Sequence, residues 1–351
     1  MVRVSVWGLA VSLVSILAIT YNGTADNAYV GYVVSMWVWV GAAYFLSHCI
    51  KLLHGRIDVD LICNYFIGVC VVQCVCALLN EFVPVFNTLV DNFVIQQSHE
   101  YLEQVDRMYG IGAAFDTAGT RFSCALIMIS YLLTRQSDDQ KTSVIYAYVL
   151  SFVFISIVGN MIARTTTAGM LVGLIYFAYQ SRVLSLKISY AYIKVIKAFT
   201  LILLLAIPIS MFLYTNPNVS SLFDYAFEGF IKMFKTGTWE TGSTNELLLM
   251  WAKLPETFKT WIIGDGYFVS PYVSNPYYIG YHTWTFYMGT DVGYLRFIYY
   301  FGLVGLLVFS LFFIICTREC ILNNKIHKAL FVMILIMNFI IWAKVATDLF
   351  C

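Results

Sequence analysis

The segment Gly293–Cys316 reads GYLRFIYYFGLVGLLVFSLFFIIC, and it decides the fold because it is apolar almost throughout. Its one charged side chain is Arg296, close to its beginning. A helix rises about 1.5 Å per residue, so about 20 apolar residues are needed to cross the hydrocarbon core of a bilayer, which is about 30 Å thick. A segment of this length and composition predicts a transmembrane helix.

Similar apolar runs occur along the whole chain. They predict nine spans, within a range of nine to eleven: Val4–Tyr21, Ala28–Ile50, Leu61–Asn80, Gly119–Thr134, Thr142–Ala163, Thr165–Gln180, Ala198–Tyr214, Gly293–Cys316 and Lys328–Ala343. The sequence therefore predicts an all-α polytopic integral membrane protein, with a single membrane domain over residues 1–351.

The composition excludes several other classes of protein. Of the 351 residues, 60% are hydrophobic and 12% are charged, and the mean hydropathy is +0.76. A soluble domain is typically about 45–50% apolar and about 25% charged. A soluble chain of this length could neither bury so much apolar surface nor cover its exterior with so few charges. A cytosolic enzyme, a disordered chain and a nucleic-acid binder with a basic face are excluded.

The distribution of charge predicts the orientation. If the N-terminus is cytoplasmic, the inner segments hold 12 basic and 5 acidic residues, a net charge of +7. The outer segments then hold the other 9 basic and 15 acidic residues, a net charge of −6. Lys and Arg are retained on the cytoplasmic side of membrane proteins, so this arrangement favours a cytoplasmic N-terminus.

Two outer segments are long, at residues 81–118 and 215–292. In the first, apolar residues from Phe82 to Val94 recur at helical spacing and predict a short amphipathic helix on the membrane surface. The second is rich in Trp, Tyr, Phe, Gly and Asn. Such residues stack on sugar rings and bind hydroxyl groups, but aromatic residues are equally common in loops that lie in the membrane interface. Both interpretations stay open.

Three arginines lie at predicted outer edges of the membrane: Arg121, Arg164 and Arg296. A single arginine in such a place often extends its side chain to the lipid headgroups. Three on one side, each near Gly, Ser or Thr, favour a shared anion site, because guanidinium groups bind phosphate oxygens in pairs and keep their charge. The anion expected at the outer leaflet is a lipid-linked phosphate or diphosphate.

His282 and Asp291 are the candidate catalytic residues. Either side chain could accept a proton from a hydroxyl nucleophile, although a lone histidine in a loop is more often incidental. The outer segments show no carboxylate pair typical of a metal site, and the chain has no phosphate-binding P-loop. We therefore expect catalysis without a metal or another cofactor.

Several segments resemble bacterial O-antigen polymerases of the Wzy type. The resemblance is carried by WIIGDGYF at Trp261–Phe268 and TDVGYLRFIYYFGLVG at Thr290–Gly305. It is also seen in RMYGIG at Arg107–Gly112, AGTRFS at Ala118–Ser123 and RTTTAG at Arg164–Gly169. It covers most of the chain from about residue 100, and the late, large outer loop is similar as well.

The resemblance implies a fold like that of GT-C membrane glycosyltransferases. It also implies an enzyme that joins oligosaccharide repeat units carried on undecaprenyl diphosphate. The reaction would occur at the periplasmic face of the bacterial inner membrane, with residues 215–292 periplasmic. Arg121, Arg164 and Arg296 would then bind the diphosphate, and Asp291 or His282 would serve as the base. The expected partners are the lipid-linked oligosaccharide, membrane lipid, a chain-length regulator and a flippase, and no nucleic acid.

Two alternatives stay open. The related O-antigen ligases, which transfer the glycan to lipid A-core, share a Gly-x-Gly turn, a histidine and an acidic residue followed by glycine. This chain has them at Gly264–Gly266, His282 and Asp291. The ligase pattern also has an arginine before an apolar helix, whereas Ser243–Asn245 contain none. The second alternative is a transporter or flippase for the same lipid-linked sugar, a class that usually shows internal repeats or charges in mid-span.

Overall fold

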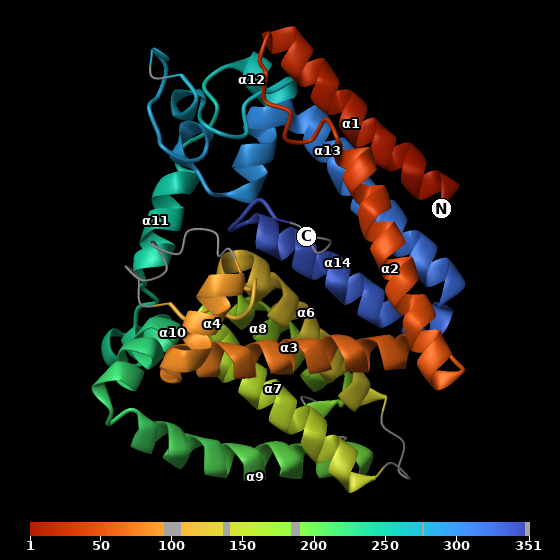
Figure 1. The fold of residues 1–351 in the computed structure, drawn as a ribbon, viewed down its shortest axis with the longest axis vertical. Helices are drawn as coiled ribbons and strands as arrows, with labels where there is room; N and C mark the ends of the chain where they lie inside the picture. The colour runs from red at the N-terminus through yellow and green to blue at the C-terminus, as the bar shows by residue number, and fades with distance from the viewer. Residues whose placement is uncertain (95–106, 136–140, 184–189, 276, 348–351) are drawn as a thin grey trace. The chain divides into compact units, whose positions relative to one another are not determined.

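The computed structural model describes residues 1–94, 107–135, 141–183, 190–275 and 277–347. These residues form α-helices, short 3₁₀ turns and loops, with two isolated β-bridges and no strand (Figure 1). The predicted all-α class is confirmed for this part of the chain.

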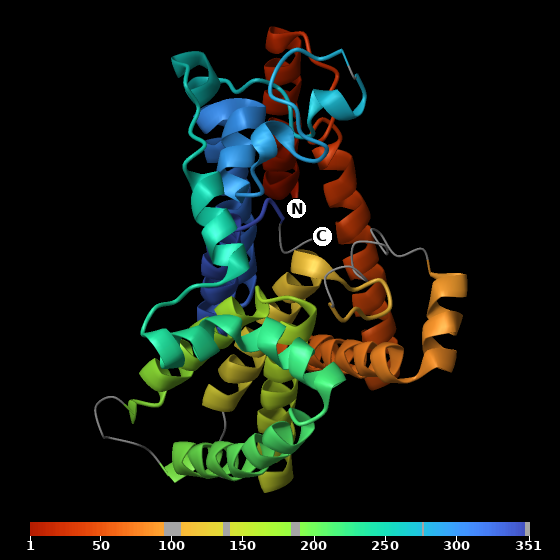
Figure 2. The same cartoon turned by 90° about the vertical axis from the view of Figure 1, so that its left-hand side faces the viewer.

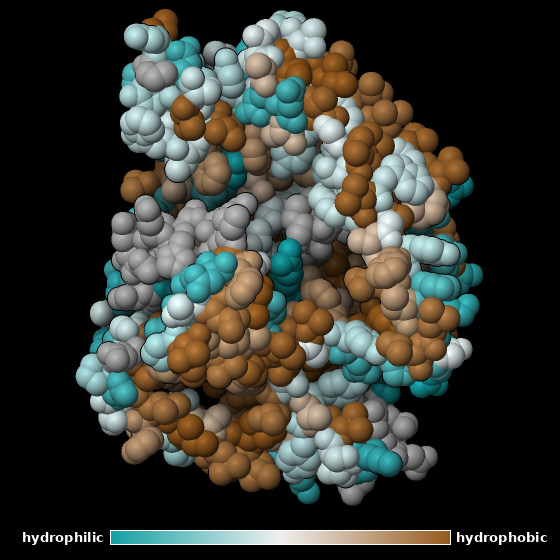
Figure 3. Space-filling model, viewed as in Figure 1, coloured by the Kyte–Doolittle hydropathy of each residue, from teal (hydrophilic) through white to brown (hydrophobic). Residues whose placement is uncertain are grey.

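Seven helices within the described ranges are long and apolar enough to cross a membrane. They are α1 (Val2–Asn22), α2 (Tyr32–His54), α3 (Val59–Phe82), α7 (Thr142–Ile162), α9 (Tyr190–Leu213), α13 (Gly293–Asn323) and α14 (Lys328–Trp342) with the 3₁₀ turn before it. Many of their side chains are apolar and exposed, for example Leu17, Val69 and Leu204. Hydrophobic residues accordingly cover much of the surface over α1, α2 and α3 (Figure 3). An exposed apolar helix surface suits contact with lipid, and the chain is a multi-pass membrane protein.

The other two predicted spans also form helices, α6 (Phe115–Thr134) and α8 (Thr166–Gln180). Neither of them is both long and apolar enough to cross a membrane. With 15 residues, α8 is about 22 Å long, which is short of the hydrocarbon thickness. The first two turns of α6 carry the charged residues Asp116 and Arg121. Nearly all of α6 after Thr117 is buried inside the protein, so it does not need a long apolar surface.

The chain divides into two compact units. Unit 1 comprises residues 1–57 and 242–351, and unit 2 comprises residues 58–241.

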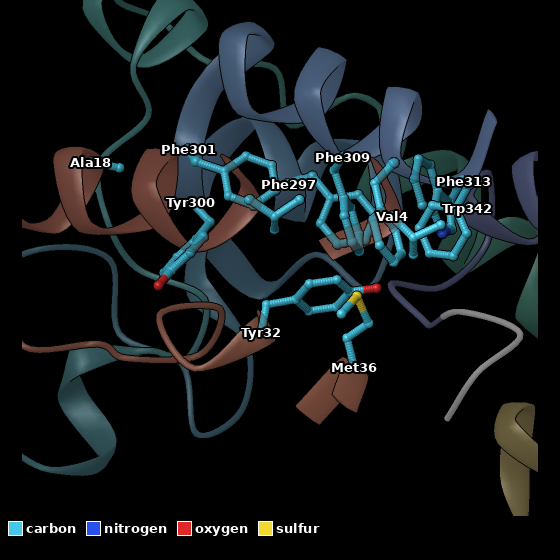
Figure 4. Close-up of a cluster of buried hydrophobic side chains, with 12 residues drawn as sticks. Val4, Ala18, Tyr32, Met36, Phe297, Tyr300, Phe301, Phe309, Phe313 and Trp342 are labelled. Atoms are coloured by element: carbon cyan, nitrogen blue, oxygen red, sulfur yellow. The ribbon is translucent and has the colours of Figure 1, made fainter. Parts of the chain in front are cut away.

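Unit 1 is built on α13, against which α1 and α14 pack, with α2 beside α1. Its core is aromatic: Phe309 of α13 stacks on Trp342 of α14 with ring centroids 5.2 Å apart, and Tyr32 of α2 meets Phe309 edge-on (Figure 4). At one end of α1, Arg3 forms an ion pair with Glu319. The other end of α1 contacts residues before and within the first turns of α13. The two helices therefore run antiparallel.

The helix α13 is broken at Phe301 and Gly302. Gly302 has a φ of 66°, and a side chain at this position would overlap the carbonyl of Ile262 in α12 (Phe258–Ile262). The amides of Asp265 and Gly266 donate to the carbonyls of Tyr299 and Tyr300, at 2.6 and 3.1 Å. The Gly-Asp-Gly turn and the Tyr-Tyr-Phe-Gly segment, which both carry the family resemblance, are therefore in direct contact.

In unit 2, α6 is enclosed by α3, α7 and α8. The contact between α6 and α8 is made by small residues: a Cβ at Gly169 would overlap the backbone of Ser123, and one at Gly173 would meet Ser130 Oγ at 2.6 Å. Small residues let helix backbones approach closely in membrane proteins. Figure 2 shows α6, α7 and α8 grouped with α3, and α9 along their edge.

The two segments predicted to be long outer loops contain helices. The first holds α4 (Pro84–Phe93). The second holds α10 (Pro217–Thr236), α11 (Gly242–Trp251), α12 and two 3₁₀ turns. Their periplasmic location stays a prediction.

We predict that Gly169→Ala destabilises the protein, whereas Gly68→Ala does not. The added methyl group at Gly169 would force α6 and α8 apart, at a cost of about 1–3 kcal/mol. A Cβ at Gly68 in α3 would meet no atom within 4 Å, and alanine favours a helix over glycine. Thermal unfolding of the two purified variants in detergent measures the difference. Equal midpoints would contradict the close packing of these helices.

Candidate functional site

Arg164 lies in the three-residue connection between α7 and α8, which is fixed on α6. The hydroxyl of Thr165 donates to the Asp116 carboxylate, and the hydroxyl of Ser123 donates to the Thr165 carbonyl at 3.0 Å. These bonds hold both sides of the connection, so the backbone beneath Arg164 has a defined position. The polar sequence between two apolar helices is thus explained by its contacts with α6.

Arg107 is placed by the turn that follows it. Met108 is fully buried, and Gln73 of α3 exchanges two hydrogen bonds with the backbone of Ile111, at 3.0 and 3.1 Å. A Cβ at Gly110 would overlap the end of the Gln73 side chain, so a larger residue there would displace these hydrogen bonds. The RMYGIG motif is therefore a tight turn on α3 that carries an arginine at its beginning.

Arg107 and Arg164 meet at one ring of α10. Their guanidinium carbons lie 5.0 and 4.2 Å from the centroid of Tyr225, within cation–π distance. Arg164 also forms an ion pair with Glu228 at 2.8 Å, and Lys232 binds the second oxygen of the same carboxylate at 2.9 Å. Arg164 and Lys232 therefore share one carboxylate, and Arg107 reaches the same tyrosine ring as Arg164. These five residues, Arg107, Arg164, Tyr225, Glu228 and Lys232, which we call the arginine cluster, include three cations and one anion.

The Glu228 carboxylate stays ionised in this setting. Burial acts to raise the pKa of Glu228, but the hydrogen bond from Lys232 and the positive charge of Arg164 outweigh burial and hold the pKa below its ordinary value. The Nε atom of Arg107 is buried and has no hydrogen-bond partner among the described residues. A bound anion could accept from that N–H group and neutralise the remaining charge.

Arg121 lies on another face of α6. Gly119 and Ser123 face the connection that carries Thr165, and Arg121 is two residues from each. Two residues correspond to about 200° around a helix, so Arg121 projects from the opposite side. Its side chain is exposed, and its carbonyl contacts Cys70 of α3. The structure does not bring Arg121 into the arginine cluster.

Arg296 belongs to unit 1 and is almost completely buried, with 5% of its side chain exposed. Its guanidinium group is held between the rings of Phe268 and Phe286, at 3.7 and 3.6 Å from their centroids. Asp291 lies 3.8 Å away, and the Phe268 carbonyl accepts a hydrogen bond at 3.5 Å. Both faces of the guanidinium group are covered by rings of the loop before α13. Arg296 therefore links that loop to the first turn of the helix.

The two candidate bases lie in different surroundings within unit 1. Asp291 is beside Arg296, as described above. The ring of His282 stacks on Tyr272 with centroids 4.3 Å apart, and its Nε2 donates to the carbonyl of Tyr278. Trp284 meets the same tyrosine edge-on. His282 is thus part of an exposed aromatic group in the loop.

Several residues of the arginine cluster were not singled out from the sequence. Arg107 occurs in a motif to which the sequence assigns no role, and no sequence motif marks Tyr225, Glu228 or Lys232 as site residues. The only sequence signal was the four-residue spacing of Glu228 and Lys232, which is typical of a helical ion pair. Among the described residues, no group of three or more His, Cys, Asp or Glu side chains could hold a metal ion.

Comparisons of the chain with models of protein families, with curated proteins and with solved structures give no match.

We predict that Glu228→Gln lowers thermal stability at neutral pH and that the difference disappears in acid. A carboxylate with a lowered pKa stabilises the fold above its unfolded pKa of about 4.3, and this contribution is lost as pH falls through the native pKa. Unfolding midpoints between pH 7 and about pH 2 test this. The control is Glu246→Gln, at an exposed position on α11, and a constant gap over this range would contradict the prediction.

We also predict that Arg296→Lys destabilises unit 1 by about 1–3 kcal/mol. A lysine ammonium group keeps the charge but cannot stack flat between two rings. Arg318→Lys, at an exposed position of the same helix, is the matched control. Thermal unfolding that shifts equally in both variants would show that the aromatic contacts of Arg296 contribute nothing.

Proposed function

We propose that the chain is a membrane glycosyltransferase that joins oligosaccharide repeat units carried on undecaprenyl diphosphate, as O-antigen polymerases do. The observation that carries the proposal is the arginine cluster, where Arg107 and Arg164 meet at Tyr225. Excess positive charge at the end of an apolar helix suits a phosphate-containing lipid headgroup.

An apolar groove in unit 2 supports a lipid as the other part of the substrate. The groove has a volume of about 490 Å³ and is lined by side chains of α3, α7, α9 and α10, of which only Ser210 is polar. It includes Met161, three residues before Arg164, and Phe223, two residues before Tyr225. An isoprenoid chain in the groove would place its diphosphate beside the arginine cluster.

The helix α10 contributes side chains to both the apolar groove and the arginine cluster. Val219, Leu222 and Phe223 line the groove, whereas Tyr225 and Glu228 belong to the cluster. The same helix therefore presents apolar side chains to the lipid part of the proposed substrate and polar side chains to the diphosphate. This is the arrangement expected for an amphipathic ligand.

The proposed reaction needs charge stabilisation more than protonation. The acceptor hydroxyl oxygen attacks the anomeric carbon of the donor, the bond from that carbon to the diphosphate oxygen breaks, and undecaprenyl diphosphate leaves with the electron pair. Arg107 and Arg164 would stabilise the negative charge that develops on the diphosphate. The hydroxyl proton passes to a base, for which Asp291 and His282 stay the candidates.

The proposal includes the remaining expectations from the sequence. The fold would be of the GT-C kind, and the reaction would occur at the periplasmic face of the bacterial inner membrane. A flippase would supply the substrate, and a chain-length regulator would limit the product. The contact between the Gly264–Gly266 turn and α13 supports the family resemblance, because two of the resembling segments form one local structure.

We predict that Arg164→Ala reduces polymer formation by about 100-fold or more, and that Arg164→Lys restores it only in part. Loss of one preorganised group that stabilises developing charge has effects of this size, and lysine cannot replace the paired contacts of a guanidinium group. The measurement is the length distribution of sugar chains on gels, in cells that lack the native gene and express each variant.

Lys235→Ala is the matched control, since Lys235 is an exposed cation on α10 outside the arginine cluster. Protein levels in the membrane are measured in parallel. A wild-type ladder from Arg164→Ala would overturn the proposed role of the cluster. Purified protein with synthetic diphosphate-linked repeat units separates a polymerase from a transporter, because only an enzyme lengthens the glycan.

A further inference from the structure

A polar pocket of about 580 Å³ lies in unit 1, and its lining includes no residue of the arginine cluster. Its walls are residues 23–27, which join α1 to α2, and residues 267, 269–271 and 273–275 of the loop after α12. These two segments lie beside each other in Figure 2. The volume is within the usual range for small-molecule sites.

The walls of the pocket are joined by hydrogen bonds between segments about 240 residues apart. Asp26 Oδ2 accepts from the amides of Phe268 and Val269, at 2.7 and 2.9 Å. The hydroxyl of Thr24 donates to the Gly266 carbonyl at 2.8 Å. The pocket is therefore formed before any ligand binds, and little ordering of the chain is needed on binding.

The pocket offers neutral hydrogen-bonding groups. Asn27 offers its side-chain amide, and Asn275 offers its Nδ2 donor, since Asn275 Oδ1 accepts from the Tyr277 amide at 3.1 Å. The Ser274 hydroxyl donates to the Pro271 carbonyl at 3.2 Å and can still accept a hydrogen bond. The hydroxyl oxygen of Ser270 is buried, with 2% of the residue exposed, and has no hydrogen-bond partner among the described residues. A buried polar atom without a partner is costly unless a ligand or water bonds to it.

The charge in the pocket argues against an ionic ligand. Its described lining contains no Lys, Arg or His, so an anion has no counter-charge there. The one carboxylate, Asp26, already accepts three backbone N–H groups, those of Phe268, Val269 and Ala28. Its oxygens are therefore committed to the fold and are poorly placed to hold a cation. A neutral ligand with several hydroxyl groups fits these conditions.

Apolar surfaces alternate with the polar groups. The ring of Tyr267 and the side chains of Pro271 and Val269 form part of the same walls. A pyranose ring has the matching pattern, because its C–H face packs on apolar surfaces and its hydroxyl groups bond to amides and hydroxyls. Next to Pro271, Tyr272 stacks on His282 and contacts Trp284, a residue that is 76% exposed, so an aromatic platform continues from the rim.

We propose that this pocket binds a neutral sugar residue of the glycan, as a saccharide subsite separate from the arginine cluster. The choice of a saccharide over other neutral polyols rests on the proposed glycosyltransferase function. The pocket would hold the sugar in position, and the aromatic platform would guide the adjoining residues of the chain. The Tyr272 and Trp284 side chains then act in binding.

The test is direct binding of simple sugars to the purified full-length protein. Saturation-transfer difference NMR is recorded with methyl glycosides of glucose, galactose, mannose, rhamnose and the two N-acetylhexosamines, in a detergent without a sugar headgroup. We expect at least one glycoside to give a signal with the wild type. We expect the signal to be about tenfold weaker with the Asn27→Ala, Asn275→Ala double variant, which loses two ligand hydrogen bonds.

Ser274→Trp is a second variant, which fills the pocket without removing an amide and should also abolish the signal. Asn323→Ala, at an exposed asparagine of α13, is the matched control and should bind as the wild type does. Thermal unfolding confirms that each variant is folded. No signal from any glycoside with the wild type, or equal signals from wild type and both pocket variants, would overturn the inference.

The outcome is distinguishable from that of the proposed function. Glycoside binding needs no lipid diphosphate, and the gel assay of Arg164 variants does not involve this pocket. Polymer formation without glycoside binding would reject the subsite and keep the polymerase. Glycoside binding without polymer formation by the purified protein would keep the subsite and reject the polymerase.

Discussion

The break in α13 constrains the rest of unit 1. A backbone carbonyl left without a donor in an apolar environment costs several kcal/mol, so a helix that breaks inside a membrane protein must find other donors. Here the amides of Asp265 and Gly266 supply them to Tyr299 and Tyr300. The absence of a side chain at Gly302 lets the end of α12 approach closely enough for these bonds to form. The position of the loop after α12 follows from this contact.

The remaining contacts of the loop after α12 also depend on the break in α13. Once the Gly264–Gly266 turn is placed, Phe268 lies where its ring covers Arg296 and its amide reaches Asp26. One residue therefore contributes to the burial of an arginine and to a wall of the polar pocket. A substitution at the break in α13 would therefore alter both the burial of Arg296 and the wall of the polar pocket. Neither the guanidinium group nor the pocket contacts Gly302 directly.

The helices could be predicted well from the sequence, because a run of apolar residues has few other stable states in a membrane. All nine predicted spans are helices, and the two that fall short of a full span are α6 and α8. Hydropathy could not show that α6 is enclosed on most sides, because that depends on glycines such as Gly169 on a helix more than thirty residues away.

The candidate site was harder to predict, because a sequence shows where charges occur and not what they contact. Arg121, Arg164 and Arg296 look alike as isolated cations near apolar runs. The structure distinguishes them by their surroundings. Arg121 lies on an exposed helix face, Arg164 pairs with Glu228, and Arg296 is held between two phenylalanine rings. Those surroundings come from residues far along the chain, such as Glu228 for Arg164 and Phe268 for Arg296, so no local pattern contains them.

Glu228 gives the arginine cluster a property that suits the exchange of a charged lipid. Without a ligand, its carboxylate neutralises part of the charge of Arg164 and keeps the guanidinium group from being buried alone, which would be costly. Lys232, four residues further on, can keep Glu228 neutralised if Arg164 turns toward a diphosphate. A carboxylate shared between two cations can thus release one of them while keeping the other. Arg164 can therefore gain and lose a diphosphate while Glu228 keeps a cationic partner.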